Sequence, residues 1–207
     1  IVKLPEMVSL AEKYNANIMI DDAHAMGVIG HQGRGTASHF GLTDSVDLIM
    51  GTFSKSFGSM GGFIAASVDI IGFLKHNARS LIFSASMPPS NAAAVSKAID
   101  IMLSEPERLQ HLGDIANYAR KQFKERGFDT GVSETPIIPL FVRDTDKALA
   151  LSTKLIDNGV FVPPVIAPAV PDSDSMIRFA LMATHSFDQV DQAIDKITKA
   201  FKNYKIL

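Results

Sequence analysis

Residues 51–62 read Gly-Thr-Phe-Ser-Lys-Ser-Phe-Gly-Ser-Met-Gly-Gly and follow the largely apolar run Val46-Asp47-Leu48-Ile49-Met50. Such a run predicts a buried strand, so Lys55 stands just beyond a strand end among glycines and small hydroxyl residues. A solvated surface lysine is not expected at such a position. Lys55 is therefore the candidate reactive group around which the other motifs are interpreted.

The composition is that of a globular protein without a strong charge. The 207 residues are 46% hydrophobic, and 20 Lys and Arg against 22 Asp and Glu give a net charge of -2. This balance gives no electrostatic reason to expect nucleic acid or an anionic membrane as partner. The chain has no cysteine, and Asp69 interrupts the best candidate for a membrane span. We expect a soluble, cytoplasmic α/β protein that, since it begins at Ile1, is a fragment of a longer one.

The first half of the chain alternates between helical and strand patterns. A helix is predicted over 4–15, and strands over 17–20, 43–50 and 61–67. This order is typical of a mainly parallel sheet flanked by helices. Ligands bind at the carboxyl ends of such strands, where Asp21 to His24 and Thr52 to Lys55 are found.

The second half predicts a smaller α+β domain. Its apolar spacing indicates a long helix over 105–126, which bridges two domains. The elements that follow are strands over 136–142, 160–165 and 176–182, and helices over 145–158 and 186–202. We therefore expect two parts, with a larger domain ending at 104 and a small carboxyl-terminal domain over 105–207.

The neighbours of Lys55 favour a cofactor site. Thr52 and Ser54 offer hydroxyls, and the surrounding glycines let backbone N–H groups approach an anion closely. An amine beside a phosphate cradle suits pyridoxal phosphate, whose aldehyde bonds a lysine. The alternatives are a lysine that caps the strand or pairs with Asp47, and a nucleotide P-loop, whose Gly-x-x-x-x-Gly-Lys-Ser/Thr pattern is missing here.

Asp21, Asp22 and His24 form the second candidate group. They contain too few ligands for an expected metal site, and we predict none. In a pyridoxal enzyme one carboxylate pairs with the ring nitrogen and keeps it protonated. We assign this role to Asp21, with His24 at the phenolic oxygen, and expect Asp22 to point the other way because side chains alternate along a strand. The alternative for the pair is a helix N-terminal cap.

Taken together, these motifs resemble those of the α-oxoamine synthases, fold-type I pyridoxal-phosphate enzymes that join an amino acid to an acyl-CoA with loss of carbon dioxide. The matching segments are Asp21-Asp22-Ala23-His24, Gly33-Arg34-Gly35, residues 51–58 with Gly61-Gly62, Arg79, residues 83–89, Ile177-Arg178 and Ala183-Thr184-His185. The resemblance runs through the whole chain and implies the carboxyl-terminal half of such an enzyme, without the earlier half of the large domain.

The resemblance implies a role for each matched residue. These are Lys55 for the Schiff base, Asp21 and His24 for the ring, Thr52 and Ser54 for the phosphate, Ser84 for the phosphate of a neighbouring subunit, and Arg178 for the substrate carboxylate. It also implies a homodimer with shared active sites, and an amino acid and an acyl-CoA as substrates.

Within the family, residues 51–56 and the loop Pro168-Ala169-Val170-Pro171 look most like the bacterial branch that condenses L-serine with palmitoyl-CoA to a 3-keto sphingoid base. Two other branches stay open, the 2-amino-3-ketobutyrate CoA ligases and the 8-amino-7-oxononanoate synthases. Outside the family, the alternatives are a fold-type I aminotransferase and a non-catalytic fragment that keeps a dimer surface and half a cofactor site.

Overall fold

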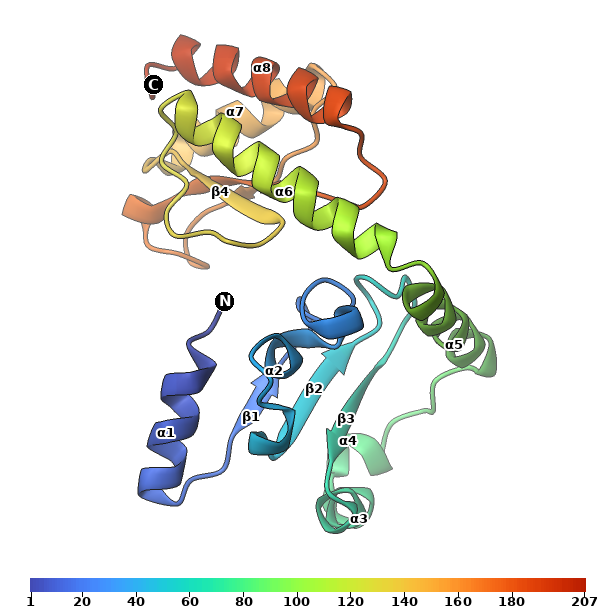
Figure 1. The fold of residues 1–207 in the computed structure, drawn as a ribbon. Helices are drawn as coiled ribbons and strands as arrows, with labels where there is room; N and C mark the ends of the chain where they lie inside the picture. Colours follow the sequence, from blue (N-terminus) through green and yellow to red (C-terminus); the bar gives the residue numbers. More distant parts are fainter. The chain divides into compact units, whose positions relative to one another are not determined.

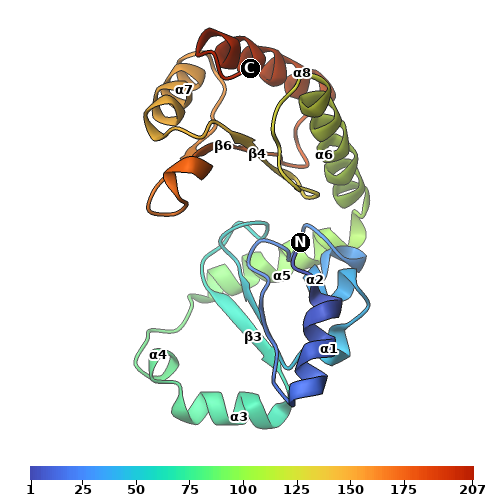
Figure 2. The same ribbon diagram turned by 90° about the vertical axis from the view of Figure 1, so that its left-hand side faces the viewer.

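A computed structural model describes all 207 residues of the chain (Figures 1 and 2). Backbone contacts divide it into two compact units, Val2–Leu109 and Gln110–Leu207, with Ile1 counted in the second. The domain limits expected from the sequence, 1–104 and 105–207, stay a prediction. The two units are described separately.

The first unit is built from three strands, five helices and two 3-10 turns. In chain order they are α1 (Leu4–Tyr14), β1 (Met19–Asp21), η1 (His31–Gly33), α2 (Gly35–His39), η2 (Thr43–Ser45), β2 (Leu48–Thr52), β3 (Gly62–Ala66), α3 (Val68–Asn77), α4 (Arg79–Ile82) and α5 (Pro89–Ser104).

The sheet of this unit has the order β1-β2-β3. β1 and β2 are parallel, with Met19 opposite Leu48 and Asp21 opposite Met50. β3 runs antiparallel to β2, because the nine residues between Thr52 and Gly62 are too few for the crossover that parallel strands need. The lysine motif forms this short connection.

The core of the first unit lies between α1 and the sheet. Leu4 and Val8 of α1 pack with Ile18, Ile20 and Ala37. Their spacing of four residues places Leu4 and Val8 on one face of the helix. This packing anchors the start of β1, whose carboxyl end carries Asp21.

The second unit contains three helices and three strands. They are α6 (Glu107–Glu125), whose first residues belong to the first unit, β4 (Ile137–Phe141), α7 (Thr145–Asp157), β5 (Pro164–Val165), β6 (Met176–Ala180) and α8 (Phe187–Asn203), with the 3-10 turn η3 (Asp172–Asp174) before β6. The strands pair antiparallel in the order β4-β6-β5. Figures 1 and 2 show the three helices on the same side of this sheet.

Apolar side chains fill the space between these helices and the sheet. Phe123 of α6 meets Phe179 of β6 edge-on, with ring centroids 5.1 Å apart. Ile194 of α8 is completely buried in the same layer. Ser186 starts α8 with a capping box, in which its hydroxyl accepts from the Gln189 N–H. The second unit thus has its own core.

The α/β fold class predicted from the sequence is confirmed. Every strand is shorter than expected, and two differ most, since the predicted 43–50 strand begins only at Leu48, after η2, and the predicted 160–165 strand pairs only at Pro164–Val165. β2, expected to be buried, is mostly half-buried. None of the helices combines the length and the apolar character that crossing a membrane requires.

Replacing Ile194 by Ala should lower the free energy of unfolding of the intact protein by about 2–5 kcal/mol, because a fully buried side chain is lost and a cavity remains. Urea unfolding followed by circular dichroism measures the change. Val132→Ala is the control: this side chain is 98% exposed, and its removal should alter stability by less than about 0.5 kcal/mol. Equal effects of the two substitutions would contradict the described core.

Candidate active site

The parallel pairing of β1 with β2 brings two polar groups to the same edge of the sheet. β1 ends at Asp21 and β2 at Thr52, and the Asp22 N–H continues the ladder by donating to the Met50 carbonyl over 2.8 Å. Since the carboxyl ends of parallel strands meet at one edge, Asp21 and the start of the lysine loop (residues 53–61) lie at that edge. His24 follows in the turn directly after β1 and is exposed.

The two hydroxyls expected to bind phosphate lie side by side. Thr52 Oγ1 is 2.9 Å from Ser54 Oγ and 3.2 Å from the Gly61 carbonyl oxygen. The Ser54 N–H also lies 3.3 Å from Thr52 Oγ1. When the Thr52 hydroxyl donates to the Gly61 carbonyl, the Ser54 hydroxyl must donate to Thr52 Oγ1, because each hydroxyl has only one proton. The Ser54 hydroxyl can donate to an anion once it rotates away from Thr52.

The expectation that no solvated lysine stands at this strand end is wrong, since Lys55 is exposed, and its ammonium group makes no hydrogen bond or ion pair within the chain. The suggested structural partner, Asp47, is occupied elsewhere, since Asp47 Oδ2 accepts from the Ile18 N–H over 2.7 Å. Asp47 also precedes β2, whereas Lys55 follows it. The alternative in which Lys55 pairs with Asp47 is therefore wrong.

Two phenylalanines anchor the lysine loop on either side of Lys55. Phe57 is buried and meets Phe53 edge-on at 5.8 Å between centroids. Phe53 also stacks on Phe63 of β3 at 5.6 Å. The aromatic side chains thus face the protein, while Lys55 and the neighbouring Ser54 are exposed.

Asp21 and Asp22 lie on opposite faces, as the alternation along the strand predicted. Asp21 is exposed, and its Oδ1 accepts from the Ala23 N–H over 2.9 Å. Asp22 is only 1% exposed, and its Oδ2 accepts from the Thr36 N–H at the start of α2 over 2.8 Å. The helix-cap alternative therefore holds for Asp22, and the Asp21 carboxylate remains accessible to a ligand.

Ser84 and Arg178 lie in different units. Ser84 follows α4 and donates its hydroxyl to the Ser80 carbonyl within the same chain. Arg178 lies on β6, half-buried, and its guanidinium makes no hydrogen bond or ion pair within the chain. A half-buried guanidinium without an internal partner fits a residue that grips a carboxylate from outside the chain.

The residues at the sheet edge fit pyridoxal phosphate. The Asp21 carboxylate suits a pyridinium nitrogen, the Lys55 amine an aldehyde, and the Thr52 and Ser54 hydroxyls a phosphate. The backbone at Gly58 is open to solvent, because a Cβ added there would meet no atom within 4 Å. The chemical groups that this cofactor requires are thus present on the β1–β2 side.

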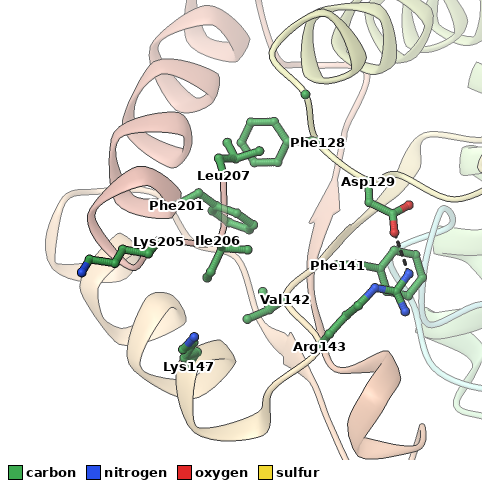
Figure 3. Close-up of a pocket in the computed structure, with 11 residues that line it drawn as sticks. Phe128, Asp129, Phe141, Val142, Arg143, Lys147, Phe201, Lys205, Ile206 and Leu207 are labelled. Carbon is green, nitrogen blue, oxygen red and sulfur yellow. Dashed lines mark hydrogen bonds and ion pairs between the residues drawn. The ribbon is translucent and has the colours of Figure 1, made fainter.

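A cavity of about 320 Å³ lies elsewhere, in the second unit (Figure 3). None of the predicted site residues lines it. At its rim Asp129 accepts from Arg143 over 2.6 Å, and this hydrogen bond, helped by the Gly131 N–H, holds the pKa of the Asp129 carboxyl below its usual value. The cavity is therefore not part of the candidate site at the β1–β2 edge.

Sequence reasoning missed Ser56, which binds the loop that follows His24. Ser56 Oγ donates to the Met26 carbonyl over 2.6 Å, across thirty residues of sequence. Its only signal in the sequence is its position next to Lys55, and nothing there reveals the partner.

Comparison with known proteins places the chain in a family. The family model for aminotransferases class I and II matches residues 2–197, and the chain belongs to this family. Among curated relatives, it is 57% identical over 206 residues to the serine palmitoyltransferase of Sphingobacterium spiritivorum, covering 100% of this chain and 52% of that protein. It is 44% identical over 207 residues to the 8-amino-7-oxononanoate synthase of Lysinibacillus sphaericus, and this match covers 100% of this chain and 53% of that protein.

A solved structure shows the same fold. A variant of the serine palmitoyltransferase from S. paucimobilis, with a bound PLP–myriocin aldimine, superposes with a TM-score of 0.95 at 29% identity and covers 100% of this chain and 52% of that one. The resemblance to the α-oxoamine synthases is thereby confirmed. The chain spans about half the length of the relatives it matches.

Gly35→Ala should destabilise the intact protein by roughly 2–4 kcal/mol, because the backbone has φ +86° and the added Cβ would lie 2.1 Å from Asp22 Oδ2. Gly41→Ala is the matched control. Its φ is +68°, but no atom lies within 4 Å of the added Cβ, so only the backbone strain of about 1 kcal/mol applies. Urea unfolding compares the two, and equal losses would argue against the close Asp22 contact.

Proposed function

We propose that this chain is the carboxyl-terminal part of a pyridoxal-phosphate-dependent acyltransferase of the α-oxoamine synthase type. The observation that carries the proposal is the exposed Lys55, without a partner in the chain, at the same sheet edge as the accessible Asp21 carboxylate. The family membership and the relatives support it. Because the chain spans about half of those relatives, the activity is proposed for the intact protein.

The bound cofactor supplies an aldehyde that bonds an amine, and a ring that accepts the electron pair left when a bond at the α-carbon breaks. Asp21 would accept the ring N–H and keep that nitrogen protonated. Thr52 and Ser54 would donate to the phosphate oxygens, and His24 would contact the phenolic oxygen. Lys55 would hold the aldehyde when no substrate is bound.

During turnover, this chain's residues hold the substrate and move its proton. Arg178 donates to the carboxylate of the incoming amino acid, for which its two parallel N–H groups are suited. With the substrate amine in its place, Lys55 would be a free amine and would take the α-proton as general base. The α-carbon would form a bond to the carbonyl carbon of the acyl-CoA as the bond from that carbon to sulfur breaks, and CoA would leave as a thiolate that takes up a proton. The bond from the α-carbon to its carboxylate would then break to release carbon dioxide, and a proton would replace the carboxylate.

The proposed substrates are L-serine and a long-chain acyl-CoA such as palmitoyl-CoA, and the product is a 3-keto sphingoid base. The identity of 57% to a serine palmitoyltransferase, against 44% to an 8-amino-7-oxononanoate synthase, favours this branch. Because the chain is also similar to an 8-amino-7-oxononanoate synthase, 8-amino-7-oxononanoate synthesis is the alternative. 2-Amino-3-ketobutyrate CoA ligase also stays open.

We further propose that the intact protein is a homodimer with shared active sites, in which Ser84 reaches the phosphate bound by the neighbouring subunit. Ser84 is exposed and directly follows three exposed apolar residues, Leu81, Ile82 and Phe83. A group of exposed apolar side chains of this kind supports a contact between subunits. The location in the cytoplasm stays a prediction.

Replacing Lys55 by Ala should abolish the covalent adduct with pyridoxal phosphate at this site, because the proposed site binds the aldehyde through the Lys55 amine. The measurement is borohydride reduction of the intact protein with the cofactor, followed by peptide mass spectrometry. Lys97→Ala, which removes an exposed lysine from α5, is the control and should label like the unmodified protein. Labelling of Lys55→Ala at the unmodified level would refute the proposed site.

Replacing Arg178 by Gln should raise the KM for the amino acid by about tenfold or more with little change in the KM for the acyl-CoA, because one charge-assisted pair is lost. The assay follows CoA release with L-serine, glycine and L-alanine against acetyl-, pimeloyl- and palmitoyl-CoA. Preference for serine with palmitoyl-CoA supports the proposed branch, and preference for alanine with pimeloyl-CoA supports the alternative. A cofactor-loaded protein inactive with every pair would favour the non-catalytic reading.

A further inference from the structure

Two hydrogen bonds hold the glycine-rich loop of residues 26–36 at its ends. At one end, the Asp22 carboxylate accepts from the Thr36 N–H over 2.8 Å. At the other end, the Met26 carbonyl accepts from Ser56 Oγ over 2.6 Å. The first bond belongs to the strand end that carries Asp21, and the second to the loop that carries Lys55. The glycine-rich loop is thus bonded to both halves of the candidate site.

The loop between these bonds is itself closed by backbone hydrogen bonds. The Gly27 N–H donates to the Gly33 carbonyl over 2.7 Å, and the Gly35 N–H donates to the Ile29 carbonyl over 2.9 Å. Met26 and Arg34 form an antiparallel bridge between the two arms. These hydrogen bonds restrict the conformations of the loop, so a displacement at one end of the loop displaces the other end.

The contact at Ser56 is close enough to require glycine opposite it. Gly27 has φ +74°, and a Cβ added there would lie 2.7 Å from Ser56 Oγ and 2.8 Å from Ser56 Cβ. Real Cβ atoms are not found at such distances. The sequence therefore provides glycine where the lysine loop packs on the glycine-rich loop, and the close packing of the two loops depends on that glycine.

The lysine loop is braced internally as well, so a constraint at Ser56 reaches Lys55. The Gly58 N–H donates to the Lys55 carbonyl over 3.0 Å, and the Ser59 N–H donates to the Phe53 carbonyl over 2.8 Å. Lys55 itself has no side-chain partner. The loop backbone therefore fixes the Lys55 Cα, from which the side chain extends, and Ser56 connects this backbone to the glycine-rich loop.

We infer that Ser56 is a positioning residue for Lys55, and that its bond to the Met26 carbonyl makes the glycine-rich loop a fixed spacer between Asp21 and the reactive lysine. The inference rests on the proposed function, because only a bound cofactor requires a defined distance between Asp21 and Lys55. A cofactor held at its ring by Asp21 and at its aldehyde by Lys55 requires those two groups at a set separation. Small errors in such placement are costly for rate.

The first experiment needs no cofactor. Ser56→Ala removes the donor, Ser56→Thr keeps it, and Ser9→Ala removes a comparable hydroxyl-to-carbonyl bond in α1, far from the site in sequence. In hydrogen exchange of the cofactor-free intact protein, Ser56→Ala should speed exchange of the Gly58 and Ser59 amides by about two- to tenfold, the loss of one hydrogen bond.

In Ser56→Ala, hydrogen exchange of the Gly27 amide in the glycine-rich loop should also become faster, as for the Gly58 and Ser59 amides. In Ser56→Thr and Ser9→Ala, the exchange rates of these amides should match those of the unmodified protein. If the Gly58, Ser59 and Gly27 amides of Ser56→Ala exchange as in the unmodified protein, or if only one of the two loops responds, Ser56 does not couple them and the inference fails. This outcome is independent of whether the protein uses pyridoxal phosphate.

The second experiment adds pyridoxal phosphate and follows the rate of adduct formation at Lys55. Ser56→Ala should slow the reaction by about fivefold or more, because the backbone that carries Lys55 is displaced. Ser56→Thr should restore the rate, and Ser9→Ala should not change it. An unchanged rate in Ser56→Ala would overturn the inference, whereas absence of an adduct in the unmodified protein would instead overturn the proposed function.

Discussion

The parallel pairing of β1 with β2 is the constraint on which the candidate site depends. It places Asp21 opposite Met50, so that the carboxyl end of one strand brings the acid and that of the other brings the lysine loop to a common edge. Neither strand achieves this alone, and β1 has only three residues. The packing of α1 against the start of β1 keeps this short strand in register. The buried apolar contacts between α1 and the start of β1 therefore help to hold Asp21 at the edge of the sheet.

Much of this arrangement could be predicted from local sequence. The apolar run before Gly51 gave the strand and the position of Lys55 at its end, and alternation along β1 gave the opposite directions of Asp21 and Asp22. The strand and the alternation depend on neighbouring residues only, through the period of a strand. The family was predicted from the combination of short motifs along the whole chain.

The features that could not be predicted depend on partners distant in sequence. Asp47 was an open partner for Lys55, and only the structure shows its carboxylate bonded to the Ile18 N–H. Likewise, a sequence does not show that Ser56 binds the Met26 carbonyl, or that Asp22 caps α2. A strand pattern also does not give its direction, and β3 is antiparallel because its connection to β2 is short. Register and hydrogen-bond partners are set by tertiary packing.

The two strand pairings that form the candidate site differ in the sequence separation of their paired residues. The β2–β3 hairpin closes over nine residues and carries the lysine, whereas β1 pairs with a strand whose matching residue is twenty-nine positions away, Met19 with Leu48. Short loops close at a lower entropic cost and sooner than long ones. Contacts close in sequence therefore define the lysine loop, whereas Asp21 reaches the same edge only through a long-range strand pairing, so a complete cofactor edge requires the native tertiary structure.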